Sequence, residues 1–279
     1  MGSFAAATVW RLRAQGLISG EEQVEDDSDR LLKKIFAKTK LKNDRSLCLH
    51  CRKPIRWYDL VPIFSWLVLR GRCRNCKKSI GVMEFASEVV LAVAFLVSFL
   101  TFDLMVGFTT LTSVVFVLWL AMLVILAIQF MYDAKWHLLI TTLTIGLFVL
   151  ACAIQAVKVY LGVYELNSLL IGITYSLIVM PGLYFALYQF SKGQWVGLGD
   201  VFILIPFAVM IADWQQSLLL VFLANLLGSI YMIPAIVSKQ ARRGLRVPFG
   251  PFLIIAFFIV ALWGGDIVGW YLKYALLAP

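Results

Sequence analysis

Long apolar segments fill the chain after residue 82, and they constrain the fold more than any other feature of the sequence. A membrane-spanning helix needs about 20 mostly apolar residues. The chain is 61% hydrophobic and 15% charged, whereas soluble domains are about half apolar and a quarter charged. We therefore predict an all-α polytopic membrane protein with about seven transmembrane helices. The predicted spans, of which the fifth is short, lie near 84–102, 108–131, 138–160, 167–190, 200–213, 217–237 and 249–272.

The rest of the chain divides into a short opening and a polar region. Residues 1–12 resemble the end of a further membrane helix that is too short here to cross. We expect residues 13–82 to form a small cytoplasmic domain with a charged insert at 13–47, and residues 83–279 to form the transmembrane domain. The insert carries an acidic cluster and then a basic stretch, and we expect such blocks to be solvated. The acidic cluster is Glu21, Glu22, Glu25, Asp26, Asp27 and Asp29, and the basic stretch is Lys33, Lys34, Lys38, Lys40, Lys42 and Arg45.

The basic residues predict the orientation in the membrane. Loops on one side of the predicted spans carry all of the 25 Lys and Arg residues except Lys158 and Lys273. Because cytoplasmic loops are enriched in Lys and Arg, this side is predicted to be cytoplasmic. The same placement explains the net charge of +9 as a membrane flank rather than a nucleic-acid surface.

Four cysteines form two Cys-x-x-Cys pairs in the polar region, Cys48 with Cys51 and Cys73 with Cys76, and 21 residues separate the pairs. This spacing suits tetrahedral coordination of Zn²⁺ by thiolates. Because four thiolates leave no open position for water, the predicted zinc is structural and the small cytoplasmic domain is predicted to be zinc-ribbon-like.

Disulfides or a redox site are the alternatives for these cysteines. A reducing cytoplasm argues against disulfides, and two pairs at this spacing favour a metal over a redox site. His50 lies between two predicted ligands and is interpreted as a side chain of the turn. The fifth cysteine, Cys152, lies in an apolar span and is assigned no role.

Two aspartates lie at the edges of predicted spans on the same side of the membrane. Asp133 follows the 108–131 span, and Asp200 ends the sequence Gly197-Leu198-Gly199-Asp200 at the start of the 200–213 span. Charged residues at such depth are rare and usually functional. Each could instead be an interfacial residue, and Asp200 could cap the helix that it begins. Three other aspartates fall on the opposite side and are poor candidates: Asp103, Asp213 and Asp266.

A facing pair of carboxylates can hydrolyse a peptide bond. Two such groups a few ångströms apart cannot both ionise at neutral pH, so they share a proton. The ionised member takes a proton from water while the protonated member polarises the scissile carbonyl. Gly197 and Gly199 are expected to let the backbone approach a substrate and to adopt unusual dihedral angles.

Short motifs along nearly the whole chain resemble those of the bacterial type IV prepilin peptidases, intramembrane aspartic proteases of the Gly-x-Gly-Asp type. Besides the cysteines and aspartates, they are Gly2-Ser3-Phe4, Arg11-Leu12, Asp59-Leu60-Val61-Pro62, Ser65-Trp66, Arg70-Gly71-Arg72-Cys73-Arg74-Asn75-Cys76, Glu88 and Pro248-Phe249-Gly250-Pro251-Phe252.

The resemblance implies an enzyme of the bacterial inner membrane that removes the leader of prepilins or pseudopilins after a Gly at the cytoplasmic face. It further implies methylation of the new N-terminus with S-adenosylmethionine. Asp133 and Asp200 match the catalytic aspartates, while Glu88 and the cysteines lie in the part linked to methylation. The chain has no glycine-rich methyl-donor loop of the soluble type.

The chain departs from the family pattern at four places. It starts at the Gly-Ser-Phe motif, which a first span normally precedes, and its charged insert is unusually long. Ile140-Thr141 replaces a usual Pro-Asp or Pro-Asn, and Phe202 replaces a usual Lys. Two other functions therefore stay open: a peptidase without methyltransferase activity, and a non-enzymatic membrane scaffold that docks partners through its zinc segment.

Overall fold

The computed structural model describes residues 2–20, 22–24, 29–30, 32–33, 48, 51, 53, 55–60, 64–79, 82–105, 110–237 and 248–276. The chain divides into two compact units, Met1–Val97 and Ser98–Pro279. The described residues form helices and contain no strand, apart from a single antiparallel bridge between Arg72 and Ser79. The predicted division at residues 12 and 82 stays a prediction.

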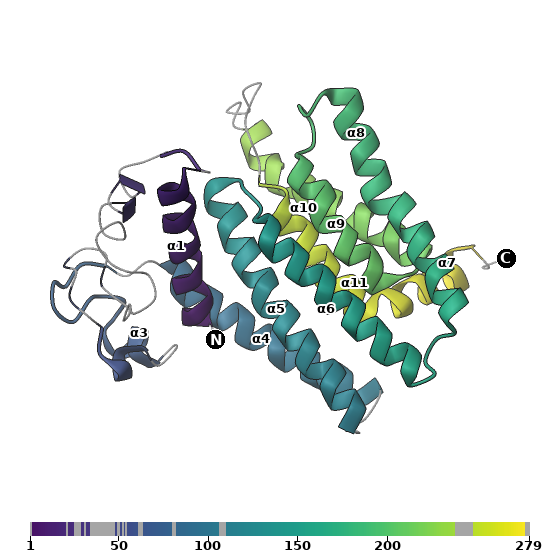
Figure 1. Cartoon of the computed structure of the whole chain (residues 1–279), viewed down its shortest axis with the longest axis horizontal. Coiled ribbons are helices and arrows are strands. Elements are labelled where there is room, and N and C mark those ends of the chain that lie inside the picture. Colours follow the sequence, from purple (N-terminus) through teal and green to yellow (C-terminus); the bar gives the residue numbers. More distant parts are fainter. Residues whose placement is uncertain are drawn as a thin grey trace. The chain divides into compact units, whose positions relative to one another are not determined.

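The first unit contains α1 (Gly2–Ser19), η2 (Trp57–Leu60), α3 (Phe64–Val68) and the start of α4 (Val82–Met105). The second unit contains the rest of α4 and the remaining helices (Figure 1). These are α5 (Thr110–Trp136), α6 (Thr141–Tyr160), α7 (Leu166–Leu177), η3 (Ile178–Gly182), α8 (Leu183–Ser191), α9 (Leu198–Ile211), α10 (Trp214–Val237), α11 (Gly250–Tyr271) and η4 (Leu272–Leu276).

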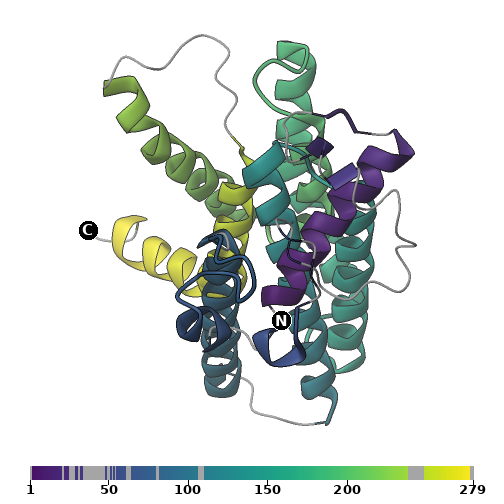
Figure 2. The same cartoon turned by 90° about the vertical axis from the view of Figure 1, so that its left-hand side faces the viewer.

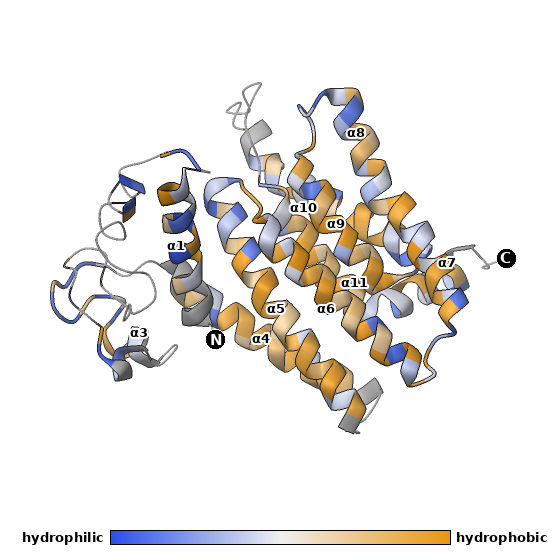
Figure 3. Cartoon of the chain, in the orientation of Figure 1, coloured by the Kyte–Doolittle hydropathy of each residue, from blue (hydrophilic) through white to orange (hydrophobic). Residues whose placement is uncertain are grey.

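Six helical segments within the described residues are long and apolar enough to cross a membrane, and α9 is a shorter apolar helix. Hydrophobic residues cover these helices on most sides (Figure 3), as expected where lipid is the surrounding solvent. The predicted all-α polytopic fold is therefore confirmed. One predicted span, 167–190, consists of α7, η3 and α8 in line, because Pro181 lacks the N–H that a regular helix needs and the chain forms a π-helical turn there.

In the second unit α6 packs against α5 and α9, and α11 packs against α5 and α10. Figure 2 shows the last part of α10 and the last part of α11 leaving this bundle in different directions. A stack of the Phe207 and Phe257 rings, with centroids 4.0 Å apart, joins α9 to α11 at the centre. The short α9 is thus enclosed by neighbouring helices, and seven of its residues are buried.

The C-terminal end of α9 lies among apolar helices, where free backbone carbonyls are costly. The buried Gln155 of α6 satisfies two of them, because its Nε2 donates to the carbonyls of Val209 and Met210, both at 2.8 Å. Gly172 of α7 lets the same end approach closely, since a Cβ atom there would lie 2.1 Å from the Ala212 carbonyl oxygen. These contacts fix the helix whose first turn carries Asp200.

In the first unit, the charged insert is not wholly solvated. Arg13 of α1 and Asp29 both have fully buried side chains, and Arg13 Nη2 and Asp29 Oδ2 lie 2.5 Å apart. Arg13 Nη1 also donates to Glu22 Oε2 at 2.8 Å. The expectation that the acidic cluster is solvated is therefore wrong for Asp29, because Arg13 neutralises it and satisfies its oxygens.

Candidate functional site

Asp133 lies in the last turns of α5 and is 5% exposed. The helix continues to Trp136, so the expectation that Asp133 follows the helix is wrong. The backbone N–H of Gly250, the first residue of α11, donates to Asp133 Oδ2 at 2.9 Å. A Cβ atom on residue 250 would lie 2.6 Å from the same oxygen, so the absent side chain is what permits this hydrogen bond. The carboxylate therefore sits at the N-terminus of α11, where the helix dipole favours negative charge.

Asp200 lies in the first turn of α9 and is partly exposed. The helix begins at Leu198, so Asp200 is its third residue rather than its first. The N–H of Gly197 donates to Asp200 Oδ2 at 3.2 Å, which is the reciprocal half of a capping box. Asp200 thus does help to cap its helix, as one interpretation of the sequence held, and its other carboxylate oxygen is not used in that bond.

The segments that carry and hold the two aspartates meet in the folded chain, because both pack against the turn after α5. Leu139, in the turn after α5, links their surroundings. A Cβ atom on Gly199 would lie 3.3 Å from Leu139 Cβ, and one on Gly250 would lie 3.3 Å from Leu139 Cδ2. The turn between α5 and α6 therefore packs against both segments that flank the carboxylates.

The unusual dihedral angles expected for the glycines at 197 and 199 are not found. Gly197 has φ of −77° and ψ of 148°, an extended conformation open to other residues, and Gly199 is not among the glycines with positive φ. Close approach explains them instead, since a Cβ atom on Gly197 would lie 3.3 Å from Asp200 Oδ2. The side chain missing at Gly199 makes room for Leu139.

Sequence reasoning missed Tyr184 of α8, which is 2% exposed and lies beside the start of α11. Asn225 Nδ2 donates to the Tyr184 hydroxyl at 3.0 Å. The Tyr184 ring lies 6.0 Å from the ring of Phe249, next to the glycine that binds Asp133. A tyrosine inside an apolar span was the available signal, but apolar spans commonly contain tyrosine near their ends.

The aspartates predicted to be poor candidates have other surroundings. Asp213 Oδ1 accepts the backbone N–H of Gln216 at 2.8 Å and so caps α10. Asp266 is exposed on α11. The side chain of Asp103 lies outside the described residues.

The four predicted cysteine ligands meet in the first unit. Their sulfur atoms all lie within 4.8 Å of one another, and none of the cysteines forms a disulfide. Zn²⁺ with Zn–S bonds of about 2.3 Å holds tetrahedral sulfurs about 3.8 Å apart. The 3.8 Å between Cys48 Sγ and Cys76 Sγ matches this spacing. The donor set therefore fits a tetrahedral metal ion.

The two cysteine turns have the same backbone pattern. The N–H of Cys48 donates to the carbonyl of Lys53 at 3.1 Å, and the N–H of Cys73 donates to that of Lys78 at 2.8 Å. Burial alone would raise the pKa of the Cys73 thiol, but backbone N–H groups of Cys76 and Asn75 and the adjacent thiols lower it to about 7. A lowered pKa favours the thiolate that a metal binds. His50, interpreted as a side chain of the turn, lies outside the described residues.

The segment between the cysteine pairs is tied to the second pair. Arg74 binds the Asp59 carboxylate through two nitrogens, with Nη2 donating to Oδ1 at 2.7 Å and Nε donating to Oδ2 at 3.0 Å. Gly71 has φ of +65°, and a Cβ atom there would meet the Trp66 ring at 2.9 Å, so both backbone and space require glycine. Trp66 in turn stacks on Phe85 at the start of α4, one turn before the buried Glu88.

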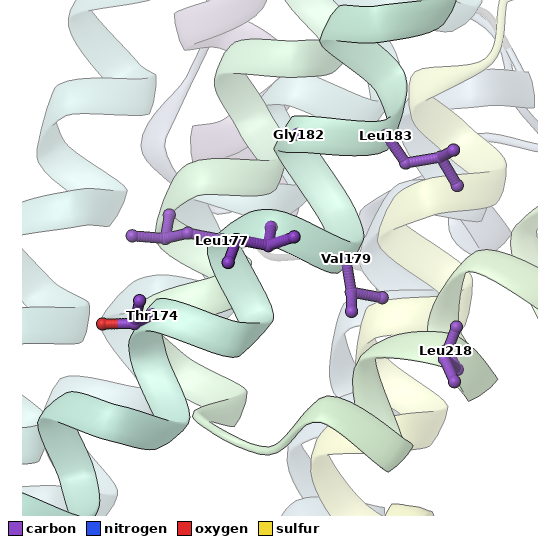
Figure 4. Close-up of a pocket in the computed structure, with 7 residues that line it drawn as sticks. Thr174, Leu177, Val179, Gly182, Leu183 and Leu218 are labelled. Carbon is purple, nitrogen blue, oxygen red and sulfur yellow. The ribbon is translucent and has the colours of Figure 1, made fainter.

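An apolar hollow of about 710 Å³ lies in the second unit between η3 with its flanking helices and Leu218 of α10 (Figure 4). Thr174 supplies its one hydroxyl group, which donates to the carbonyl of Leu170 in its own helix at 2.8 Å. Neither aspartate lines it. The hollow thus offers no catalytic group.

The fold, the two aspartates beside one turn and the four clustered cysteines define the class of protein. It is a multi-pass membrane protein with a pair of aspartates on neighbouring segments and a four-cysteine segment that fits a metal ion. Residues 1–102 match the model of the bacterial peptidase A24 N-terminal domain. The prepilin leader peptidase/N-methyltransferase of Aeromonas hydrophila is 31% identical, over 82% of this chain and 74% of that protein. The protein of the same name from Dichelobacter nodosus is 30% identical, over 80% of this chain and 72% of that protein. The one from Aeromonas salmonicida is 28% identical, over 96% of this chain and 85% of that protein.

The chain belongs to the family of prepilin leader peptidase/N-methyltransferases, and the resemblance stated from its motifs is confirmed. No solved structure matches the chain.

Proposed function

We propose that the protein removes the leader peptide from type IV prepilins or pseudopilins and then methylates the new N-terminus with S-adenosylmethionine. The observation that carries the peptidase half is that the segment of Asp200 and the glycine that binds Asp133 pack against the same residue, Leu139. The names of the relatives, which cover most of this chain, support both halves.

Asp133 and Asp200 are the proposed catalytic pair. The ionised carboxylate takes a proton from a water molecule as the water oxygen bonds to the scissile carbonyl carbon, and the protonated carboxyl group donates a hydrogen bond to the carbonyl oxygen. The C–N bond then breaks as its nitrogen accepts a proton, which releases the leader with a new carboxyl group and the pilin with a new amino group. Gly197 precedes α9 and Gly199 lies in its first turn, and we expect this segment to border the substrate.

Cleavage follows a Gly of the substrate at the cytoplasmic face of the inner membrane in this proposal. The distribution of Lys and Arg among the loops supports a cytoplasmic location for both aspartates and for the cysteine cluster. The lipid bilayer and the pilin are then the two partners of the protein, and nucleic acid is not one of them.

Cys48, Cys51, Cys73 and Cys76 are the proposed ligands of a structural Zn²⁺. The ion would join two turns that lie 21 residues apart in sequence. Because a metal ion that joins distant turns adds its binding free energy to folding, this link would contribute directly to the folding of the first unit.

Methyl transfer would use S-adenosylmethionine as the donor, with Glu88 as an associated residue. Its burial at the start of α4 and its match to the family motif support this assignment. The peptidase-only alternative differs in one measurement. Labelled S-adenosylmethionine transfers its methyl group to cleaved pilin in the wild type if the protein is bifunctional, and it does not if the protein is a peptidase alone.

Coexpression with candidate pilins tests the peptidase proposal. Asp133→Asn and Asp200→Asn are expected to abolish leader loss, seen as a retained larger pilin on a gel, while both variants still accumulate in the membrane. Asp266→Asn changes an exposed aspartate of α11 and is the matched control. Leader loss in either Asn variant would disprove the catalytic pair, and normal processing in the double variant would favour the scaffold.

A further inference from the structure

Gln129 is a fully buried residue of α5, one helical turn before Asp133. Its side-chain amide pairs with the backbone of Ile140 across the turn to α6. The Ile140 N–H donates to Gln129 Oε1 at 2.9 Å, and Gln129 Nε2 donates to the Ile140 carbonyl at 3.0 Å. Nε2 also donates to Thr144 Oγ1 at 3.0 Å. The amide thus uses both its acceptor and its donor groups within the turn.

The surroundings make this pairing difficult to replace. Ile140 is the N-cap of α6, and its apolar side chain makes no capping hydrogen bond. Its backbone N–H is satisfied by Gln129. An amide or a backbone group without a partner costs several kcal/mol in an apolar environment. We therefore expect Gln129 to hold Ile140 in one position relative to α5.

Fixing Ile140 also fixes Leu139, the residue before it. Leu139 is the side chain that meets both Gly199, next to Asp200, and Gly250, which donates to Asp133. A Cβ atom at either glycine would lie 3.3 Å from Leu139, which is closer than most carbon–carbon contacts, so Leu139 packs close to both backbones. Leu139 therefore occupies the space between the segments that carry and hold the two carboxylates.

We propose that Gln129 and Leu139 are positioning residues that set the separation between Asp133 and Asp200. The hydrogen bonds of Gln129 hold the turn against α5. Leu139 packs against the starts of α9 and α11 and so sets their distance from this turn. This inference rests on the proposed function, because the separation matters for catalysis if the pair performs it.

The pH profile of cleavage distinguishes this role from a general contribution to stability. Sharing of one proton between two carboxylates depends on the distance between them. A changed spacing therefore alters the pH range in which the pair carries one proton. A merely less stable protein loses activity in proportion to the folded protein that remains, so its rate per amount of folded protein keeps the same pH optimum.

The experiment measures leader cleavage of a purified pilin by membranes that contain each variant, across pH. Gln129→Leu and Leu139→Ala are expected to lower kcat about 10- to 100-fold, with little change in KM, since misplacement near 1 Å costs about that much. Both are also expected to shift the pH optimum by about one unit.

Two variants serve as matched controls. Gln155→Leu removes another buried glutamine that binds backbone carbonyls, but at the far end of α9. Leu138→Ala shortens the neighbouring, exposed leucine of the same turn. Both are expected to keep the shape and optimum of the wild-type pH profile, although Gln155→Leu should lower the melting temperature.

Each result has a defined meaning. The positioning role is disproved if Leu139→Ala and Gln129→Leu keep the wild-type pH profile. It is also disproved if Gln155→Leu shifts the pH optimum by the same amount. Because Gln129→Leu could fail to accumulate, Leu139→Ala carries the test in that case. Asp133→Asn in the same series separates the proposed function from the positioning role. Cleavage by Asp133→Asn refutes the proposed function. If Asp133→Asn is inactive and the Gln129 and Leu139 variants keep the wild-type pH optimum, only the positioning role is refuted.

Discussion

Replacement of Gly250 by alanine tests how closely Asp133 depends on the start of α11. The added Cβ would lie 2.6 Å from Asp133 Oδ2 and 3.3 Å from Leu139 Cδ2. Because an ordinary carbon–oxygen contact is about 3.3 Å, the carboxylate or the helix must move by about 0.7 Å. The 2.9 Å hydrogen bond from the Gly250 N–H to the carboxylate is then stretched or lost.

Two separate considerations give a similar magnitude for this variant. A hydrogen bond to a charged group contributes about 1.5–3 kcal/mol, and about 1.4 kcal/mol corresponds to a tenfold change in rate. Misplacement of a catalytic group by 1 Å can cost about 100-fold in rate. We therefore expect Gly250→Ala to lower kcat for leader cleavage by about 10- to 100-fold.

The assay is leader cleavage in membranes, with the amount of each variant measured beforehand. Gly265→Ala in the same helix is the matched control, since a Cβ there meets nothing within 4 Å and alanine favours a helix. Cleavage by Gly250→Ala at the wild-type rate would refute the reasoning, and an equal loss in Gly265→Ala would show that α11 responds to any added methyl group.

Three further predictions concern stability and metal content. Asp29→Asn removes the buried one of the two carboxylates that pair with Arg13 and should destabilise the first unit by about 3 kcal/mol, measured by limited proteolysis of residues before the first span. Cys73→Ser should reduce the zinc content of the purified protein and increase proteolysis of the same unit, whereas Cys152→Ser should change neither. Gly172→Ala should lower the melting temperature, because its Cβ would lie 2.1 Å from a backbone carbonyl, while Gly146→Ala, with its nearest contact at 3.7 Å, should not.

Hydropathy located the helices of the second unit well, because every helix that crosses lipid needs about 20 mostly apolar residues. The predicted 138–160, 217–237 and 249–272 differ by only a few residues from α6, α10 and α11. The ends were less predictable. Helix α5 continues past the apolar residues to Trp136, because the packing of Tyr132 and Trp136 keeps polar residues such as Asp133 within a buried helical turn.

The cysteine cluster could be predicted from sequence because short-range spacing forms each turn and metal chemistry joins the two. The buried ion pair of the charged insert could not, since a run of acidic residues does not reveal which of them meets a partner. Arg13 and Asp29 lie 16 residues apart, and their pairing depends on how the insert folds back on α1.

The sequence by itself predicted that two aspartates, Asp133 and Asp200, lie at the same edge of the membrane, because hydropathy and loop charge are properties of residues in order. Only the tertiary structure decided what surrounds them: the Gly250 N–H on Asp133, Leu139 between the flanking segments, and Gln129 holding the turn. These contacts join residues up to 117 positions apart, and they depend on distances of a few tenths of an ångström that no local pattern encodes.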